Sequence, residues 1–385
     1  MNNDIRKQFD ILNKITYFDS AALVLKPKIA IDAIHNYYEN ISISSRTQDT
    51  PLGNLVNQTI FNVRQKVANL IDAKINEIIF TSGTTESINL FVNMFSHLLK
   101  PKDVILLHSY NHSSNLVPWI EIAKKTKAII KISDDVELDL IKTKNIKILA
   151  LSQETNNFNK SFDFSLISKI CKEKKIWLFN DAAQAISHSK VSLNLFDIVV
   201  FSTNKFYGPT GMGILAIKED LLKKLRPVKF GGGTVNEINK DHSFVLKTDI
   251  SVFEPGTPDI AGFFMFDKGL DFFNSIGYQR TQNILKNLSI YLHKKLMKLK
   301  NINVYSKPGH YIALINVKNI NPQDVATYLG QKNIYTIAGI FCAQYLKNVV
   351  SEHSFLRISL GIYNNYDDID KLVDELEKGG DFYAF

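Results

Sequence analysis

A lysine stands where a buried strand gives way to a loop rich in glycine and proline, and this pattern constrains the fold more than any other in the chain. The run Ile198 to Phe201 is apolar and mostly β-branched, which predicts a short strand buried on both faces. Lys205 follows, and four residues after it prevent a helix from continuing: Gly208, Pro209, Gly211 and Gly213. Open α/β sheets bind ligands at the carboxyl ends of their strands. The pattern therefore predicts an α/β fold with Lys205 at a ligand site.

Two interpretations of Lys205 are open at this point. A partly desolvated amine at a strand end can form a Schiff base with an aldehyde cofactor such as pyridoxal 5'-phosphate. An isolated loop lysine, however, is far more often a solvated surface residue. The choice depends on the other groups that this cofactor needs, which are a carboxylate for the pyridine nitrogen, an anion site for the phosphate and donors for the ring hydroxyl.

A second short apolar strand is predicted from Ile176 to Asn180, and it leads directly to Asp181 and then Gln184. Asp181 could bond the pyridine nitrogen and keep it protonated, so that the ring withdraws electrons from the substrate. Gln184 could then reach the ring oxygen. Asp181 could equally cap the helix that follows, and the two roles are compatible.

The segment from Glu77 to Glu86 reads as a strand, a glycine turn and the start of a helix with an apolar face. Its turn, from Ser82 to Thr85, would lie at the helix N-terminus. Free N–H groups and the helix dipole favour a phosphate there. The same hydroxyl groups could form an ordinary helix cap, and the sequence leaves both interpretations open.

The composition is that of a globular enzyme. The chain has 385 residues, of which 45% are hydrophobic and 22% charged, enough for two domains with substantial cores. No apolar run approaches the length of a membrane span, and the polar opening is unlike a secretory signal, so we expect a cytoplasmic protein without a membrane partner. The net charge of +8 arises from scattered lysines, so no direct nucleic-acid partner is expected.

The chain contains two cysteines, so we expect neither a disulfide framework nor a metal site. Cys171 falls on the apolar side of a predicted helix and is expected in the core. Cys342 lies between an apolar run and a loop. A solitary cysteine is more often a small buried hydrophobe than a nucleophile, and the local pattern does not decide its role.

An ordered series of motifs resembles the class V aminotransferase-like pyridoxal enzymes, and within them the cysteine desulfurases of the Suf/NifS-like group. The motifs are YFDSAA (17–22), FTSGTTESINL (80–90), HSSNLVPW (112–119), ETNN (154–157), NDAAQA (180–185), STNKFYGPTGMG (202–213), FEPGTPD (253–259), FCAQ (341–344) and LRISLGIYNN (356–365). The resemblance implies the type I fold of pyridoxal-phosphate-dependent transferases, an α/β fold whose large cofactor-binding domain (15–264) has a mostly parallel sheet. A smaller α+β domain (265–385), joined by the N-terminal arm (1–14), would follow. The resemblance also implies a homodimer with cofactor sites at the subunit boundary.

The resemblance also implies roles for individual residues. Lys205 would hold the cofactor aldehyde, and Asp181 would bond the ring nitrogen. His112 would stack on the ring and belong to the catalytic residues, while Asn156 and Gln184 would bond the ring oxygen. Hydroxyl and amide side chains would bind the phosphate: Thr84, Thr85, Ser202 and Asn204 of the same chain, together with Thr257 from the neighbouring subunit.

The implied reaction converts L-cysteine to L-alanine. Arg357, together with Asn156, would bind the substrate carboxylate, a task that suits the planar guanidinium. Lys205 would remove the α-proton once it is free of the aldehyde. Cys342, as a thiolate, would take the sulphur as a persulfide and pass it to an acceptor protein in iron–sulphur cluster assembly or tRNA thiolation.

Several positions depart from the family pattern. The family usually has arginine and paired histidines shortly before the cysteine, where this chain has Ile337, Ile340 and Phe341. It usually has histidine at the positions of Ser113 and Asn204. Asparagine still donates a hydrogen bond, so phosphate binding can survive that change. The apolar residues before the cysteine leave two alternative functions open. The chain could be a selenocysteine lyase or another class V pyridoxal enzyme, or it could be a non-catalytic partner-binding scaffold.

Overall fold

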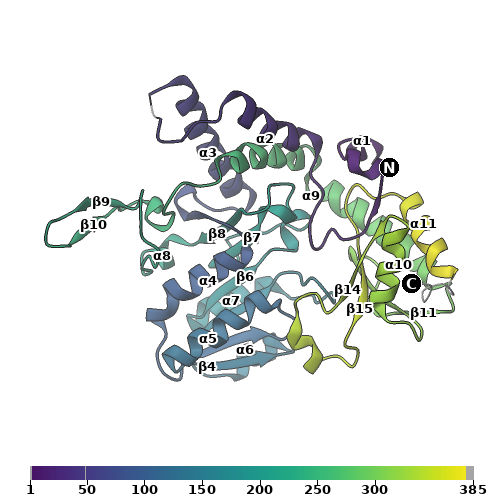
Figure 1. Ribbon diagram of the computed structural model, residues 1–385. Helices are drawn as coiled ribbons and strands as arrows, with labels where there is room; N and C mark the ends of the chain where they lie inside the picture. The colour runs from purple at the N-terminus through teal and green to yellow at the C-terminus, as the bar shows by residue number, and fades with distance from the viewer. Residues whose placement is uncertain (1, 48, 379–385) are drawn as a thin grey trace.

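A seven-stranded sheet forms the centre of the computed structural model, which describes residues 2–47 and 49–378 (Figure 1). The strand order is β2-β8-β7-β6-β5-β3-β4; β8 runs antiparallel to both neighbours and the other pairs are parallel. The bounds are β2 Ile78–Thr81, β3 Val104–His108, β4 Ile129–Ser133, β5 Ile146–Ser152, β6 Trp177–Asp181, β7 Ile198–Ser202 and β8 Gly213–Ile217. The predicted α/β architecture with a mostly parallel sheet is confirmed.

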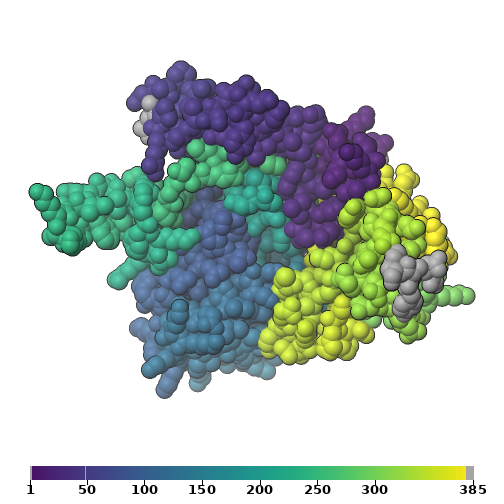
Figure 2. Space-filling view, viewed as in Figure 1, coloured from purple at the N-terminus to yellow at the C-terminus, as the bar shows by residue number. Residues whose placement is uncertain are grey.

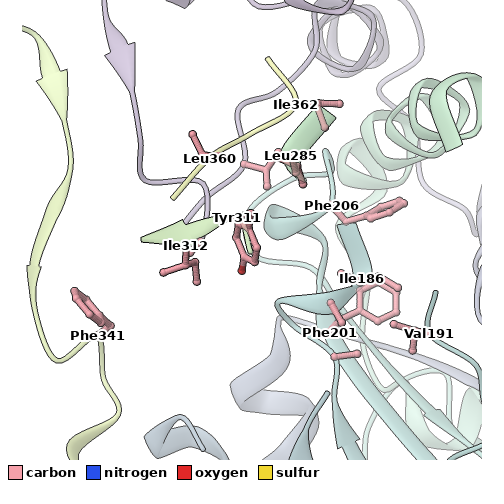
Figure 3. Packing of buried hydrophobic residues seen from close by; sticks show 14 of the residues in the cluster. Ile186, Val191, Phe201, Phe206, Leu285, Tyr311, Ile312, Phe341, Leu360 and Ile362 are labelled. Carbon is pink, nitrogen blue, oxygen red and sulfur yellow. The ribbon is translucent and has the colours of Figure 1, made fainter. Parts of the chain in front are cut away.

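The two faces of this sheet pack into different apolar cores, which explains why its strands are apolar throughout. Along β7, Val199 and Phe201 belong to one core, whereas Ile198 and Val200 belong to the other. The helices α4 (Thr84–Phe95) and α5 (Val117–Thr126) contribute to the core that contains Ile198 and Val200. The opposite core receives α3, α6 and α7, with bounds Pro51–Leu70, Val136–Lys142 and Phe164–Lys174. Figure 3 shows part of this second core.

A four-stranded antiparallel sheet lies beside the large one, in the order β11-β12-β15-β14. Its elements, with the two helices that accompany it, are β11 Ile302–Val304, β12 Ile312–Val317, β14 Ile337–Gly339, β15 Phe355–Ser359, α10 Pro322–Gln331 and α11 Tyr366–Glu377. The long helix α9 (Ile260–Leu296) connects the two regions and is interrupted at Gly277, whose φ is 73°. The predicted domain boundary after residue 264 falls inside α9, and the division at that point stays a prediction.

The N-terminal segment packs against the C-terminal part of the chain, as the neighbouring purple and yellow regions of Figure 2 show. Arg6 of α1 (Asn3–Arg6) forms an ion pair of 2.7 Å with Asp368. Strand β1 (Thr16–Tyr17) pairs in parallel with β13 (Ile334–Tyr335). Helix α2 (Lys28–Asn40) then packs along α9. These contacts bring residues near 19 close to residues near 357, which matters for the site.

A hairpin of β9 (Val235–Ile238) and β10 (Phe244–Leu246) projects from the body of the molecule (Figures 1 and 2). Ile238, Phe244 and Val245 are exposed on it. The sequence analysis did not predict this hairpin. Exposed apolar side chains gathered on a projection are typical of a protein interface.

The other helical elements are short. They are α8 (Glu219–Leu222) and the 3₁₀ turns η1 Asp10–Asn13, η2 Ile75–Glu77, η3 Ser96–Leu98, η4 Ser113–Asn115, η5 Ala185–Ser187, η6 Thr203–Lys205, η7 Ile250–Phe253 and η8 Gln344–Asn348. Among the described residues, none of the helices combines the length and apolar character that crossing a bilayer would require.

Candidate active site

A cavity of about 190 Å³ lies where the carboxyl ends of β5, β6 and β7 meet the N-terminus of α4. Its lining includes every predicted cofactor-binding residue except Thr257: Thr84, Thr85, His112, Asn156, Asp181, Gln184, Ser202, Asn204 and Lys205. Ser114, Ser152 and Glu154 also line it and were not predicted. The position agrees with the rule that α/β sheets bind ligands at the carboxyl ends of their strands.

Lys205 and Asp181 place an amine and a carboxylate in the same cavity. Lys205 ends the single turn η6 directly after β7, so the loop begins with a short 3₁₀ turn that the sequence analysis did not expect. Burial lowers the pKa of Lys205, against the opposing effect of the Asp181 carboxylate. Burial likewise raises the pKa of Asp181, whose Oδ1 accepts the N–H of Ala183 at 3.1 Å. A lysine with a lowered pKa is more often neutral at pH 7 and can attack an aldehyde.

Hydroxyl and N–H donors gather at the N-terminus of α4. Thr84 N–H donates to Ser202 Oγ at 2.7 Å, and the two hydroxyl groups lie 2.8 Å apart. Gly213 on the neighbouring strand β8 lets the turn before α4 lie this close to the sheet, because a Cβ on Gly213 would lie 2.5 Å from the Cα of Gly83. The predicted strand, glycine turn and helix are confirmed here. The donors and the helix dipole suit a phosphate group.

His112 lies over the same cavity with its ring orientation fixed by the backbone. Its Nδ1 accepts the N–H of Ser114 at 3.1 Å, and the Ser114 hydroxyl lies 2.8 Å from that of Thr85. Burial lowers the pKa of His112 to about 4, and the positive charges of Lys205 and Arg357 act in the same direction. The ring is therefore neutral at pH 7, as stacking on a protonated pyridine ring requires.

The neutral state of His112 predicts a pH dependence of stability. The folded chain binds the proton of this residue only near pH 4, whereas the unfolded chain binds it from an ordinary pKa of 6.5. The unfolded state therefore holds more protons between these values, and stability falls as the pH falls. We expect the free energy of unfolding by urea to drop by about 2 kcal/mol more in the wild type than in His112→Gln between pH 7.5 and 5. Equal drops in the two proteins would contradict this assignment.

Arg357 is fully enclosed and tied to the N-terminal segment. Its exposed fraction is 2%, and its Nη2 donates to Asp19 Oδ1 at 2.7 Å. Its Nη1 donates to the carbonyl oxygen of Asn156 at 3.1 Å, while its Nε has no hydrogen-bond partner. The sequence analysis missed Asp19, although it stands inside the YFDSAA motif. Arg357 is not among the residues that line the cavity, and its role as the carboxylate-binding residue stays a prediction.

Three contacts hold the loop that carries Cys342, and the one to Asn156 reaches a residue that lines the cavity. The carbonyl oxygen of Cys342 accepts the N–H of Ser113 at 2.7 Å, and that of Phe341 accepts the Nδ2 of Asn156 at 2.7 Å. The guanidinium of Arg357 lies 4.6 Å above the ring of Phe341. Phe341 and Cys342 both have positive φ, at 56° and 57°, and the thiol of Cys342 is exposed.

The apolar departures before the cysteine have a packing role. Ile340, which precedes the cysteine, forms a small core with Ala343 and Leu346, which follow it, and with Tyr110. Phe341 is buried against Arg357, as described above. Apolar burial thus anchors both ends of the loop. The side chain of Asn204 lines the cavity.

One predicted site residue, Thr257, lies away from this cavity. Thr257 is exposed and lines a separate cavity of about 330 Å³ with Arg64 and Glu254, so a single chain does not bring it to Lys205. Its predicted role concerns a neighbouring subunit and stays a prediction. Cys171 is buried in α7, as expected, and burial raises the pKa of its thiol to about 12.

The donor set fits pyridoxal phosphate. A buried carboxylate at Asp181 suits the protonated ring nitrogen, and the donors around Thr84 suit the phosphate. The amine of Lys205 suits the aldehyde. Each group comes from a different strand end, so the fit depends on the whole sheet rather than on one motif.

Comparison with known proteins agrees with this site. The family model described as "Aminotransferase class-V" matches residues 16–372. A probable cysteine desulfurase of Ureaplasma parvum serovar 3 is 34% identical, with 94% of this chain and 93% of that protein covered. One from Borreliella burgdorferi is 35% identical, with 97% and 95% covered. The apo structure of a cysteine desulfurase from Thermococcus onnurineus NA1 superposes with a TM-score of 0.93 at 27% identity, covering 97% of each chain. The chain therefore belongs to the class V aminotransferase family.

Proposed function

We propose that this chain is a cysteine desulfurase that converts L-cysteine to L-alanine and retains the sulphur as a persulfide on Cys342. One observation carries the proposal: an exposed cysteine follows Phe341, whose carbonyl oxygen accepts from Asn156, and Asn156 lines the cavity that contains Lys205. The named activity of the related proteins supports it. A transaminase or a simple lyase has no need of a thiol in that place.

The cofactor is pyridoxal 5'-phosphate, which when bound supplies an electron sink for the α-carbon of the substrate. In the proposed site Asp181 and Lys205 would hold its ring nitrogen and aldehyde. The ring of His112, neutral at pH 7, would stack on it. Phosphate binding falls to the hydroxyl groups and amides at the N-terminus of α4.

The remaining residues handle the substrate. Arg357 and Asn156 bind its carboxylate, and the amine of Lys205 moves the α-proton. The thiolate of Cys342 attacks the substrate sulphur, so that an S–S bond forms and the C–S bond breaks. The electron pair of the broken bond stays on carbon and takes up a proton, which yields alanine. Exposure of the thiol leaves the persulfide open to an acceptor.

The assembly and the acceptor are also part of the proposal. We infer a homodimer, because Thr257 and the exposed apolar hairpin β9–β10 lie on the surface away from the cavity of their own chain. A sulphur-accepting scaffold protein for iron–sulphur clusters or a tRNA-thiolation protein would receive the sulphur. Both roles place the chain in the cytoplasm.

Product analysis tests the proposal. With L-cysteine as the only thiol, purified protein loaded with cofactor should form about one alanine per chain in a fast burst and then slow, because the persulfide blocks Cys342 and is released only slowly by the substrate thiol. A thiol reductant should restore turnover by releasing the sulphur. Alkylation and mass mapping should find the persulfide on Cys342 and none on buried Cys171, which is the internal control. Absence of alanine would defeat the proposal.

A further inference from the structure

Two histidines lie against a single carboxylate beside the cofactor cavity. Glu154 follows β5, His188 follows η5, and His310 precedes β12 of the four-stranded sheet. The Nε2 of His188 is in hydrogen-bond contact with Glu154 Oε2, and the Nε2 of His310 lies 3.5 Å from the same oxygen. The side chains are 15%, 9% and 9% exposed, respectively. The cluster joins three segments that are far apart in sequence, and Glu154 itself lines the cavity.

A carboxylate with two imidazoles has the composition of a metal site, but the hydrogen bonds of His310 do not suit one. Its Nδ1 accepts the N–H of Ile312 at 3.3 Å, so the proton of the neutral ring lies on Nε2. A histidine that binds a metal through Nε2 instead donates from Nδ1. Burial alone would raise the pKa of Glu154, but the two imidazoles outweigh it and hold that pKa well below its usual range. His188 and Glu154 therefore form a charge-assisted hydrogen bond, while the Nε2 of His310 faces the same carboxylate at 3.5 Å without a hydrogen-bond partner of its own. These three side chains are called the Glu154 network below.

Tyr311 packs against both imidazoles of the Glu154 network. Its ring centroid lies 4.2 Å from that of His188 and 4.7 Å from that of His310. The phenol is buried, and Figure 3 shows its hydroxyl directed away from Leu285 and Leu360. That hydroxyl donates to the Oε1 of Gln184. The network thus reaches the cofactor cavity through Tyr311.

The contacts of Gln184 fix which end of its amide is which. Oε1 accepts from Tyr311, and Nε2 donates to the carbonyl oxygen of Ala21 at 2.9 Å. A backbone carbonyl can only accept, so the nitrogen must face Ala21. The second N–H of Nε2 is then the group that Gln184 can offer to the cavity. A hydrogen bond to the amide oxygen also polarises the amide and strengthens its N–H as a donor.

We propose that Tyr311, clamped by Glu154, His188 and His310, is a positioning residue that orients the Gln184 amide as a donor to the ring oxygen of the cofactor. The proposal rests on the proposed function, in which Gln184 faces that oxygen. It assigns a task to residues that the reaction itself does not use. It also couples the four-stranded sheet, through His310 and Tyr311, to the electronic state of the cofactor.

A pH titration of the visible absorption of the bound cofactor tests the proposal. The bound chromophore shares one proton with its ring oxygen, and when that proton is lost the oxygen bears the full negative charge. A hydrogen-bond donor to the ring oxygen therefore stabilises the deprotonated chromophore and lowers the pH of the spectral midpoint. Tyr311→Phe removes the bond that fixes and polarises the amide. We therefore expect the spectral midpoint to move to higher pH by about half to one unit in that variant. Tyr291→Phe, which loses a remote bond to Asp370, is the matched control and should keep the wild-type midpoint.

Glu154→Gln separates positioning from a direct charge effect. Removal of a nearby negative charge would by itself lower the midpoint, since that charge favours the protonated chromophore. Loss of the clamp on Tyr311 should raise it, in the direction of Tyr311→Phe. A rise supports the positioning role of Glu154, and a fall or an unchanged midpoint overturns it. Stoichiometric zinc or iron in the purified protein would also overturn the proposal, because the two imidazoles would then serve as ligands.

The outcome for this network is distinct from the outcome for the proposed function. An unchanged midpoint in Tyr311→Phe, with the cofactor bound at wild-type level, would refute the network alone. A wild-type protein without a lysine-bound chromophore would refute the proposed function itself. A folding defect in either variant would show in the urea midpoint, and Tyr311→Leu, which removes the hydroxyl donor without adding volume to the buried site, then repeats the spectral test.

Discussion

Replacement of Lys205 by alanine is expected to lower alanine formation from L-cysteine by about a thousandfold or more, since the variant lacks the group proposed to move the α-proton. The same change removes the amine that is proposed to hold the cofactor aldehyde. Treatment with borohydride should therefore leave no covalent cofactor on the variant, whereas the wild type should carry it on Lys205. The fold should persist, because the side chain lies in a cavity rather than in the apolar core.

Lys26 provides the control for this experiment because it is the rival amine. Its Nζ donates to the carbonyl oxygen of Asn204, next to Lys205, and burial lowers its pKa to about 7. Lys26→Met should keep both the borohydride adduct and most of the activity. An adduct mapped to Lys26, or a Lys205→Ala protein that keeps its activity, would contradict the assignment of the catalytic lysine.

Replacement of Cys342 by alanine is expected to lower persulfide formation and cysteine-dependent alanine release by about a hundredfold or more, with the cofactor still bound. The thiol is the group proposed to take the sulphur, and its exposed side chain contributes nothing to the apolar core. Alanine and persulfide should be measured together, so that a slow β-elimination without sulphur transfer is recognised. Cys171→Ala, altered in the core, is the matched control and should keep the activity of the wild type.

The same variant separates the two enzymatic alternatives. A selenocysteine lyase can cleave its substrate without the cysteine, so Cys342→Ala should then keep its activity toward selenocysteine while it loses activity toward cysteine. Equal loss on both substrates supports the desulfurase. A wild-type protein that binds the cofactor yet acts on neither substrate would favour a partner-binding scaffold.

The loop around Cys342 shows why the family departures do not by themselves argue against activity. Ile340 is used to pack the loop, and Phe341 lies under the guanidinium of Arg357. The carbonyl oxygen of Phe341 also accepts a hydrogen bond from the side-chain amide of Asn156, a residue expected to bind substrate and cofactor. The position of the thiol is thus coupled to the residues that would receive the substrate carboxylate.

Local sequence determined the elements on which the site is built. The apolar runs before Asp181 and Lys205 form buried parallel strands, and Thr84 begins a helix after a glycine turn, as predicted. These features depend on residues within a few positions of one another, such as β-branched runs, glycine and capping hydroxyl groups. Cys171 was placed in the core by its helical spacing for the same reason.

Only the tertiary structure decided which distant side chains meet. Asp19 reaches Arg357 because β1 and the first helix pack on the C-terminal region, and no local pattern carries that information. Glu154 is flanked by His188 and His310 because the loop before β12 packs over the ends of β5 and β6. Such contacts depend on long-range packing and on burial of the charged groups, which a short window of sequence does not encode.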